Sequence, residues 1–295
     1  MQVGVSKWVA KLHYFRDGST RYTVHQDPIS IDLDGDGVDE ILFGGLETQP
    51  NTPAEFSPIN IHVLGWSDGT LRDVTSAWLP AGANEMFGVG QFTFGDFNGD
   101  GRVDVFCAAY ADMEHAFTPF YLLNQGSSLK KFELPVTTAW QHGAASGDLN
   151  NDGFDDVLAI GYGNSANKVY LGSAEGLLQA EITNWNGGSG ATFGRFLNDQ
   201  DIQVVEVDHW QVDADSVLGK LKVAEGQNQV SFEQISVLPV PRIEDPVSPE
   251  EDSHDVRIVP FDFNYDGLDD VVIFSRAWWD GSKWPDESAV KFLRN

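Results

Sequence analysis

The sequence predicts an all-β fold, a β-propeller built of four-stranded blades, and three observations support this prediction. A nine-residue acidic pattern recurs along the chain, at residues 32–40, 96–104, 148–156 and 262–270. Each copy is followed by a short apolar run of the kind that forms a buried strand. Successive units are roughly 50 to 65 residues long, which is the size of one propeller blade.

Each copy has the spacing of a cation-binding loop. Oxygen-bearing side chains stand at positions 1, 3, 5 and 9, and glycine stands at position 6. Alternate side chains and the carbonyl of position 7 then converge on one hard cation, while glycine permits the sharp turn. We expect about four Ca²⁺ ions. The expected ligands, with position 7 acting through its carbonyl, are Asp32, Asp34, Asp36, Val38 and Glu40; Asp96, Asn98, Asp100, Arg102 and Asp104; Asp148, Asn150, Asp152, Phe154 and Asp156; and Asp262, Asn264, Asp266, Leu268 and Asp270.

The residues that follow each loop exclude a helix-loop-helix calcium site. Such a site needs a bidentate glutamate at position 12, and the four copies have Phe43, Cys107, Ala159 and Ile273 there. The apolar runs 41–43, 105–107, 157–160 and 271–274 predict the strand after each loop. Further strands are expected at 60–64, 120–123, 168–171 and 290–293.

A fifth copy of the pattern, at residues 195–203, has lost three of its ligands. It aligns without gaps with residues 96–104, but Arg195, Leu197 and Gln203 replace the oxygen ligands. We expect no calcium there, and we expect Arg195 to pair with Asp199 in its place.

Five loop positions predict five blades in a single domain that spans residues 1–295. A sixth, incomplete blade or a truncated larger ring remains an alternative. Residues 8–24 are expected to form a hairpin ahead of the first loop. An N-terminal strand is expected to complete the last blade, because a ring that mixes strands from both chain ends has no exposed edge.

The loops, which read Asp-Phe-Asn-x-Asp-Gly-x-x-Asp in their fullest form, give residues 25–295 a resemblance to the FG-GAP or VCBS repeat family. The integrin alpha-chain head is its best-known relative. The resemblance implies a propeller with calcium in the loop between the first two strands of a blade. The chain departs from the family in the degenerate loop at 195 and in having a phenylalanine-glycine pair directly before only two of its five loops, at Phe94-Gly95 and Phe193-Gly194. The ligand of integrins does not carry over, because the family includes many binders and some enzymes.

Composition narrows the class of partner and the location. Forty-five acidic residues against 18 basic ones give a net charge of −27, which argues against nucleic acid or an anionic membrane as partner. The single cysteine, Cys107, excludes an intrachain disulfide. No transmembrane run and no signal peptide are visible. Calcium loops of extracellular modules bind at about 10⁻⁴ to 10⁻³ M. We therefore expect an extracellular or periplasmic location, as part of a longer secreted protein.

The face opposite the calcium loops is the expected ligand-binding face, since the longer connections gather there. Tryptophan supplies a stacking plane for sugars and an anchor for protein partners. An alternative for any single tryptophan is that it packs between blades as core. Six of the nine tryptophans fall in these connections: Trp140, Trp185, Trp210, Trp278, Trp279 and Trp284.

Two classes of function follow from these features. The first is a calcium-stabilised extracellular recognition module, carbohydrate-binding or adhesive, that binds glycan or protein. The second is an extracellular polysaccharide lyase or hydrolase, for which no catalytic residue can be assigned and Asp280, Asp286, His209 and His254 are candidates. A purely structural adhesin segment is a third alternative. His25, His142 and His254 precede the first strand of their blades, and either a ring of functional histidines or a repeated turn residue explains them.

Overall fold

The computed structural model describes residues 21–24, 28–48, 59–67, 69–86, 89–109, 118–135, 141–161, 167–183, 185, 190–197, 201–207, 216–224, 228–238, 254–277 and 288–293. Within these residues the protein is almost entirely β-structure. One short helix, α2 (Thr75–Trp78), and the two-residue strand β6 (Glu85–Met86) lie between the first and second repeat units.

Five repeat units follow one another along the chain. Each of the first four contains a four-stranded meander, to which blade 1 adds β1, and three strands of the fifth are described. Their bounds are β1 (Arg21–Val24), β2 (Ile29–Ile31), β3 (Glu40–Thr48), β4 (Ile59–Ser67) and β5 (Thr70–Asp73) in blade 1; β7 (Val89–Gly95), β8 (Asp104–Ala109), β9 (Phe120–Asn124) and β10 (Leu129–Glu133) in blade 2; β11 (Gln141–Gly147), β12 (Asp156–Gly161), β13 (Lys168–Leu171) and β14 (Leu178–Thr183) in blade 3; β15 (Gly190–Gly194), β16 (Gln203–Val207), β17 (Ser216–Val223) and β18 (Gln229–Leu238) in blade 4; and β19 (His254–Phe261), β20 (Asp270–Ala277) and β21 (Ser288–Leu293) in blade 5.

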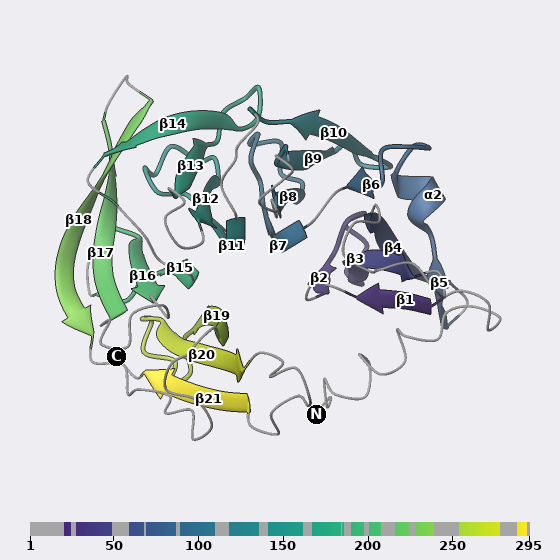
Figure 1. Ribbon diagram of the computed structural model, residues 1–295. Coiled ribbons are helices and arrows are strands. Elements are labelled where there is room, and N and C mark those ends of the chain that lie inside the picture. The colour runs from purple at the N-terminus through teal and green to yellow at the C-terminus, as the bar shows by residue number, and fades with distance from the viewer. Residues whose placement is uncertain are drawn as a thin grey trace.

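The blades stand around a common centre, as Figure 1 shows. The first strands β2, β7, β11, β15 and β19 lie innermost, and β5, β10, β14, β18 and β21 lie outermost. Neighbouring strands within each blade are antiparallel. The predicted all-β propeller of five blades is therefore confirmed.

Three details differ from five separate four-stranded sheets. Strand β6 pairs with β4, so that the sheet of blade 1 has six strands. Strand β14 pairs in parallel with β18, so that blades 3 and 4 share one eight-stranded sheet. Strand β1 pairs with the far end of β3, in line with β2, and so extends the innermost strand of blade 1. The first half of the predicted hairpin at residues 8–24 lies outside the described residues.

The core lies between the blades. Strand β12, with the sequence Asp-Val-Leu-Ala-Ile-Gly, is buried along its whole length, because a neighbouring blade covers each of its faces. Its even and odd positions enter two different clusters: Leu158 and Ile160 pack with blade 4, and Val157 and Ala159 pack with blade 2. This two-sided burial explains why the strands that follow the loops read as continuous apolar runs rather than as alternating ones.

No helix among the described residues is long and apolar enough to cross a membrane.

Candidate metal centres

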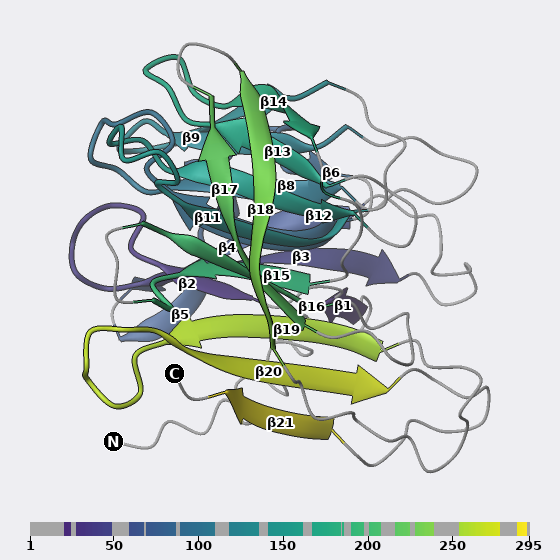
Figure 2. The ribbon, with the colours of Figure 1, turned by 90° about the vertical axis from the view of Figure 1, so that its left-hand side faces the viewer.

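Each acidic loop joins the first strand of its blade to the second. The loop of blade 1 connects β2 to β3, and those of blades 2, 3 and 5 connect β7 to β8, β11 to β12 and β19 to β20. Figure 2 shows the blade 1 and blade 5 loops projecting on the left, from the same face of the ring as the loops of blades 2 and 3. The predicted sharing of one face by these loops is therefore visible in the structure.

The four loops have the same internal hydrogen bonds. The backbone N–H of the glycine at position 6 donates to Oδ2 of the aspartate at position 1, at 2.8 to 3.0 Å in all four copies. The N–H of position 5 donates to the side-chain oxygen of position 3. The N–H of position 7 donates to Oδ1 of position 5. These bonds fix three oxygen-bearing side chains in each loop, and each oxygen keeps a further lone pair for a cation.

The backbone explains the glycines and reveals a second special position. Position 6 has a left-handed φ of 80 to 90° in Gly37, Gly101, Gly153 and Gly267, a region that glycine enters without steric penalty. Position 4 is also left-handed, and there two copies have the non-glycine residues Asn151 (φ 56°) and Tyr265 (φ 59°). The sequence pattern did not reveal this second requirement, because glycine, asparagine and tyrosine all occur at position 4.

The carboxylate at position 9 is buried in each of the four loops. It accepts the backbone N–H of position 2, from Leu33, Phe97, Leu149 and Phe263 respectively, at 2.9 to 3.2 Å. In blades 2 and 3 its other oxygen accepts a further N–H at 2.8 Å, from Asn124 and Gly172. Position 9 thus ties the start of the loop to the end of the third strand.

A buried carboxylate among other acids needs a compensating positive charge. Burial, together with the charges of the other loop aspartates, raises the pKa of Asp104 and of Asp156 to about 7. Burial likewise raises the pKa of Glu40, which faces Asp32, Asp34 and Asp36. In blade 1 the oxygens of Asp32, Asp34 and Glu40 lie within 4.8 Å of one another. A set made only of oxygen donors fits a hard divalent cation such as Ca²⁺.

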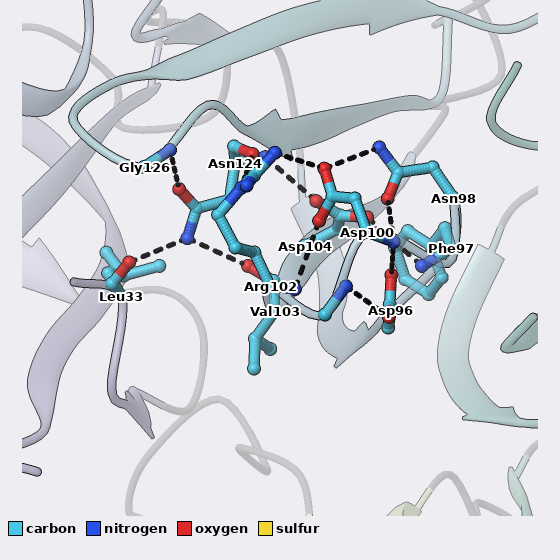
Figure 3. Close-up of polar contacts among 11 residues, drawn as sticks. Leu33, Asp96, Phe97, Asn98, Asp100, Arg102, Val103, Asp104, Asn124 and Gly126 are labelled. Carbon is cyan, nitrogen blue, oxygen red and sulfur yellow. Dashed lines mark hydrogen bonds and ion pairs between the residues drawn. The ribbon is translucent and has the colours of Figure 1, made fainter. Parts of the chain in front are cut away.

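The loop of blade 2 differs from the other three calcium loops in containing a basic side chain. Its position 7 is Arg102, whose guanidinium pairs with Oδ2 of Asp100, a predicted ligand (Figure 3). The Arg102 Nε donates to the Asn124 carbonyl at 2.8 Å. Asn124 in turn donates its side-chain N–H to the Leu33 carbonyl of blade 1 at 2.7 Å. The loop is therefore linked to the neighbouring blade.

At position 9 the degenerate loop of blade 4 keeps the hydrogen bonds without the charge. Gln203 stands at position 9 and its Oε1 accepts the N–H groups of Phe196 and Leu197 at 2.8 and 2.9 Å. A neutral amide thus replaces the carboxylate where no cation is expected. The Arg195 backbone exchanges two hydrogen bonds with Asp269 of blade 5, both at 2.8 Å. The predicted partner of the Arg195 side chain, Asp199, lies outside the described residues.

Among the predicted ligand-binding tryptophans, the structure describes Trp185 only. Its ring is 6 % exposed, stacks on Phe232 at 4.9 Å between centroids and donates its Nε1–H to Glu206. Trp185 is therefore a core residue and offers no stacking surface. The other five, Trp140, Trp210, Trp278, Trp279 and Trp284, lie outside the described residues, as do His25, His209, Asp280 and Asp286. The backbone of His142 lies in β11 and that of His254 begins β19.

The fold and the repeated loops define a β-propeller made of acidic-loop repeats. The FG-GAP-like repeat matches residues 32–107, and the FG-GAP repeat matches residues 141–172. These two regions of the chain are therefore FG-GAP repeats, as their loops suggested. No curated protein is similar enough in sequence to count as a relative.

Among solved structures, the chain is similar to CoXyl43, a GH43 beta-xylosidase/alpha-arabinofuranosidase from a compost microbial metagenome, crystallised with xylotriose in a calcium-free form. The two chains share 12 % sequence identity over 94 % of each, with a TM-score of 0.41.

Proposed function

We propose that this protein is a calcium-stabilised recognition module that works outside the cell and binds glycan or protein through the face opposite its calcium loops. One observation supports the calcium part above all others. Four loops, far apart in the sequence, have the same hydrogen-bonded geometry around a buried carboxylate, and the fifth loop replaces that carboxylate with an amide.

Oxygen atoms of the loop itself would hold the ion. Side chains at positions 1, 3, 5 and 9 and the carbonyl of position 7 supply the oxygens, and the internal N–H bonds hold those side chains in place. When bound, the ion supplies the positive charge that the buried carboxylate lacks. Because position 9 also bonds the end of the third strand in blades 2 and 3, binding stiffens the whole end of the blade.

A stiff blade end favours recognition by the opposite face, because less conformational entropy is lost when a partner binds. Calcium of millimolar concentration is found outside cells, which suits loops of moderate affinity. The tryptophan-rich segment at 278–284 is the proposed contact for the partner. The net charge of −27 favours a partner that is neutral or basic.

Calcium titration of single-loop variants tests the first half of the proposal. The wild-type protein is expected to bind four ions, and Asp148→Asn is expected to bind three, since asparagine keeps a hydrogen-bond acceptor but removes the charged ligand. Asp201→Asn is the matched control, because this exposed aspartate lies in the degenerate loop and pairs with Lys220 at 2.8 Å. Equal stoichiometry in wild type and Asp148→Asn, or a lost ion in Asp201→Asn, contradicts the assignment.

Replacement of Trp278, Trp279 and Trp284 together by alanine tests the second half. The variant is expected to lose binding to whichever glycans or extracellular proteins the wild type retains on an array. Trp66→Ala is the control, because this tryptophan is 47 % exposed on β4 and lies outside the proposed segment. Undiminished binding by the triple variant removes that segment from consideration.

A further inference from the structure

Position 8 of the blade 3 loop is hydrogen-bonded to the loop of blade 2. This residue is Asp155, which stands between Phe154 and Asp156, two expected ligands. Its Oδ2 accepts the backbone N–H of Asp96 at 2.8 Å, and its own N–H donates to the Asp96 carbonyl at 2.9 Å. Asp96 is the first ligand of the blade 2 loop. Two hydrogen bonds therefore join one calcium loop directly to the next.

The seam around these bonds is tightly packed. A β-carbon built on Gly95, just before the blade 2 loop, would lie 2.6 Å from the Asp155 carboxylate. A β-carbon built on Gly99, at position 4 of the same loop, would lie 2.7 Å from the ring of Phe154. The two loops thus approach as closely as glycine allows. Because the contact leaves no slack, a displacement of one loop moves the other.

Asp96 passes the contact on to the rest of the blade 2 loop. Its Oδ1 accepts the N–H of Asp100 at 3.0 Å, and its Oδ2 accepts the N–H of Gly101 at 2.8 Å. On the other side of the seam, Asp156 accepts the N–H of Leu149 at 2.9 Å and so closes the blade 3 loop. An ordered blade 3 loop therefore holds the backbone of Asp96, and Asp96 holds the blade 2 loop.

Position 8 is apolar in two other blades. It is Val103 in blade 2 and Ile202 in blade 4, and neither side chain can accept a hydrogen bond. Blade 2 bonds blade 1 through the side chain of Asn124, which donates to the carbonyl of Leu33 at 2.7 Å. Leu33 is not an expected ligand, so this contact does not reach the calcium site of blade 1 directly.

Blades 1 and 5 have aspartate at position 8, and neither residue is bonded to a second calcium loop in the described part of the chain. Asp39 accepts a hydrogen bond from Ser30 of its own blade. Asp269 exchanges two hydrogen bonds with Arg195 as Asp155 does with its partner, but Arg195 belongs to the loop in which no calcium is expected. Within the described residues, Asp155 alone connects two loops that have the full ligand pattern.

We propose that the calcium sites of blades 2 and 3 bind their ions cooperatively and that Asp155 is the positioning residue that couples them. This inference rests on the proposed calcium binding. The first ion orders its own loop and, through the seam, part of the other loop, so less conformational entropy is lost when the second ion binds. Because coupling between two binding sites is reciprocal, each ion raises the affinity for the other by the same factor.

The charge of Asp155 favours the same sign of coupling. Two bound cations repel each other, which alone would weaken binding of the second ion. The partly buried Asp155 carboxylate lies within electrostatic reach of Asp148 and Asp96, the first ligands of the two loops: burial raises the pKa of Asp155, and these two charges add to the increase. The negative charge of Asp155 therefore attracts an ion in either site and offsets the repulsion between the two.

Proteins with only two intact sites test the coupling. Asp32→Asn combined with Asp262→Asn removes the sites of blades 1 and 5, and a further Asp96→Asn or Asp148→Asn leaves a single site. In calorimetric calcium titration, the second ion of the two-site protein is expected to bind about five-fold or more tightly than the ion of either single-site protein. Two ions bound with the single-site affinities overturn the coupling. Absence of binding in all of these proteins refutes the proposed calcium binding as well.

Asp155→Ala in the two-site protein tests the role of the residue. The variant loses the side-chain bond to Asp96, so the ratio of two-site to single-site affinity is expected to fall to about one. A purely structural defect would weaken the single sites too and leave this ratio unchanged. Asp269→Ala is the matched control, because it removes the same bond to Arg195 in the seam between blades 4 and 5. A ratio that Asp155→Ala leaves intact, or that Asp269→Ala lowers equally, overturns the assignment.

Hydrogen exchange gives a second measurement, in the full chain with a single substitution. At a calcium concentration that half-saturates the wild type, the amides of residues 96–104 are expected to exchange faster in Asp148→Asn, although the blade 2 loop itself is unaltered. Asp262→Asn, which removes the blade 5 site, is the control and is expected to leave the exchange of these amides unchanged. Equal exchange at 96–104 in Asp148→Asn and wild type contradicts the coupling, whereas wild-type amides that calcium does not slow contradict the calcium assignment itself.

Discussion

Replacement of Glu40 by glutamine is expected to destabilise the protein in calcium but not in chelator. Glu40 is buried at position 9 of the blade 1 loop, and its Oε2 accepts the Leu33 N–H at 3.0 Å. The degenerate blade shows what an amide does there: Gln203 accepts the equivalent N–H of Phe196 at 2.8 Å. Glu40→Gln therefore keeps the hydrogen bond and removes only the charge.

The magnitude follows from binding linkage. At a calcium concentration ten times the dissociation constant, one site adds about 1.4 kcal/mol to the free energy of unfolding. Loss of that site lowers the melting temperature by about 3 to 5 °C. In chelator the variant loses no stability, because the buried charge of Glu40, which lies near Asp32, Asp34 and Asp36, is gone.

Differential scanning calorimetry in calcium and in chelator measures both states. Glu133→Gln, at an exposed position that ends β10, is the control and is expected to change neither melting temperature. Equal destabilisation of Glu40→Gln in calcium and in chelator would refute the reasoning, since the residue would then act only through its packing.

Three further predictions concern the loops. Arg102→Leu removes a cation from Asp100 and is expected to tighten calcium binding by the blade 2 loop several-fold in a titration; unchanged or weaker binding contradicts this. In metal-free protein, burial raises the pKa of Asp104 and of Asp156 from 3.8 to about 7, so the folded state binds more protons than the unfolded state in this range. The melting temperature of metal-free protein is therefore expected to fall between pH 5.5 and pH 8, and a rise would be the opposite of the prediction. Gly153→Ala, at φ 90°, is expected to lower the free energy of unfolding by about 1 to 2 kcal/mol in chemical denaturation, and an unchanged midpoint would show that the loop relaxes.

Much of the metal loops could be predicted from the sequence, because the ligand pattern is local. Spacing alone placed oxygen donors at positions 1, 3, 5 and 9 and glycine at position 6. The same spacing identified Gln203 as the neutral counterpart of position 9, and the structure gives it the same hydrogen bond. The left-handed φ of position 4 escaped detection, because the residues there share no chemical property.

Features that depend on tertiary contacts could not be predicted. Trp185 lies in a glycine-rich connection, which is typical of surface loops, yet Glu206 and Phe232 from other strands bury its ring. The parallel pairing of β14 with β18 joins segments of two different blades. The exposure of Phe263 is likewise not predicted by its position in the loop, where it matches the buried Phe97 within the same Asp-Phe-Asn triplet.

Anomalous diffraction from crystals grown in millimolar calcium tests the central claim most directly. We expect one ion in each of the loops at 32–40, 96–104, 148–156 and 262–270, with oxygen ligands at about 2.3 to 2.6 Å, and none at 195–203. Loops without ions under these conditions, or an ion held by residues 195–203, would contradict the assignment of calcium to these repeats.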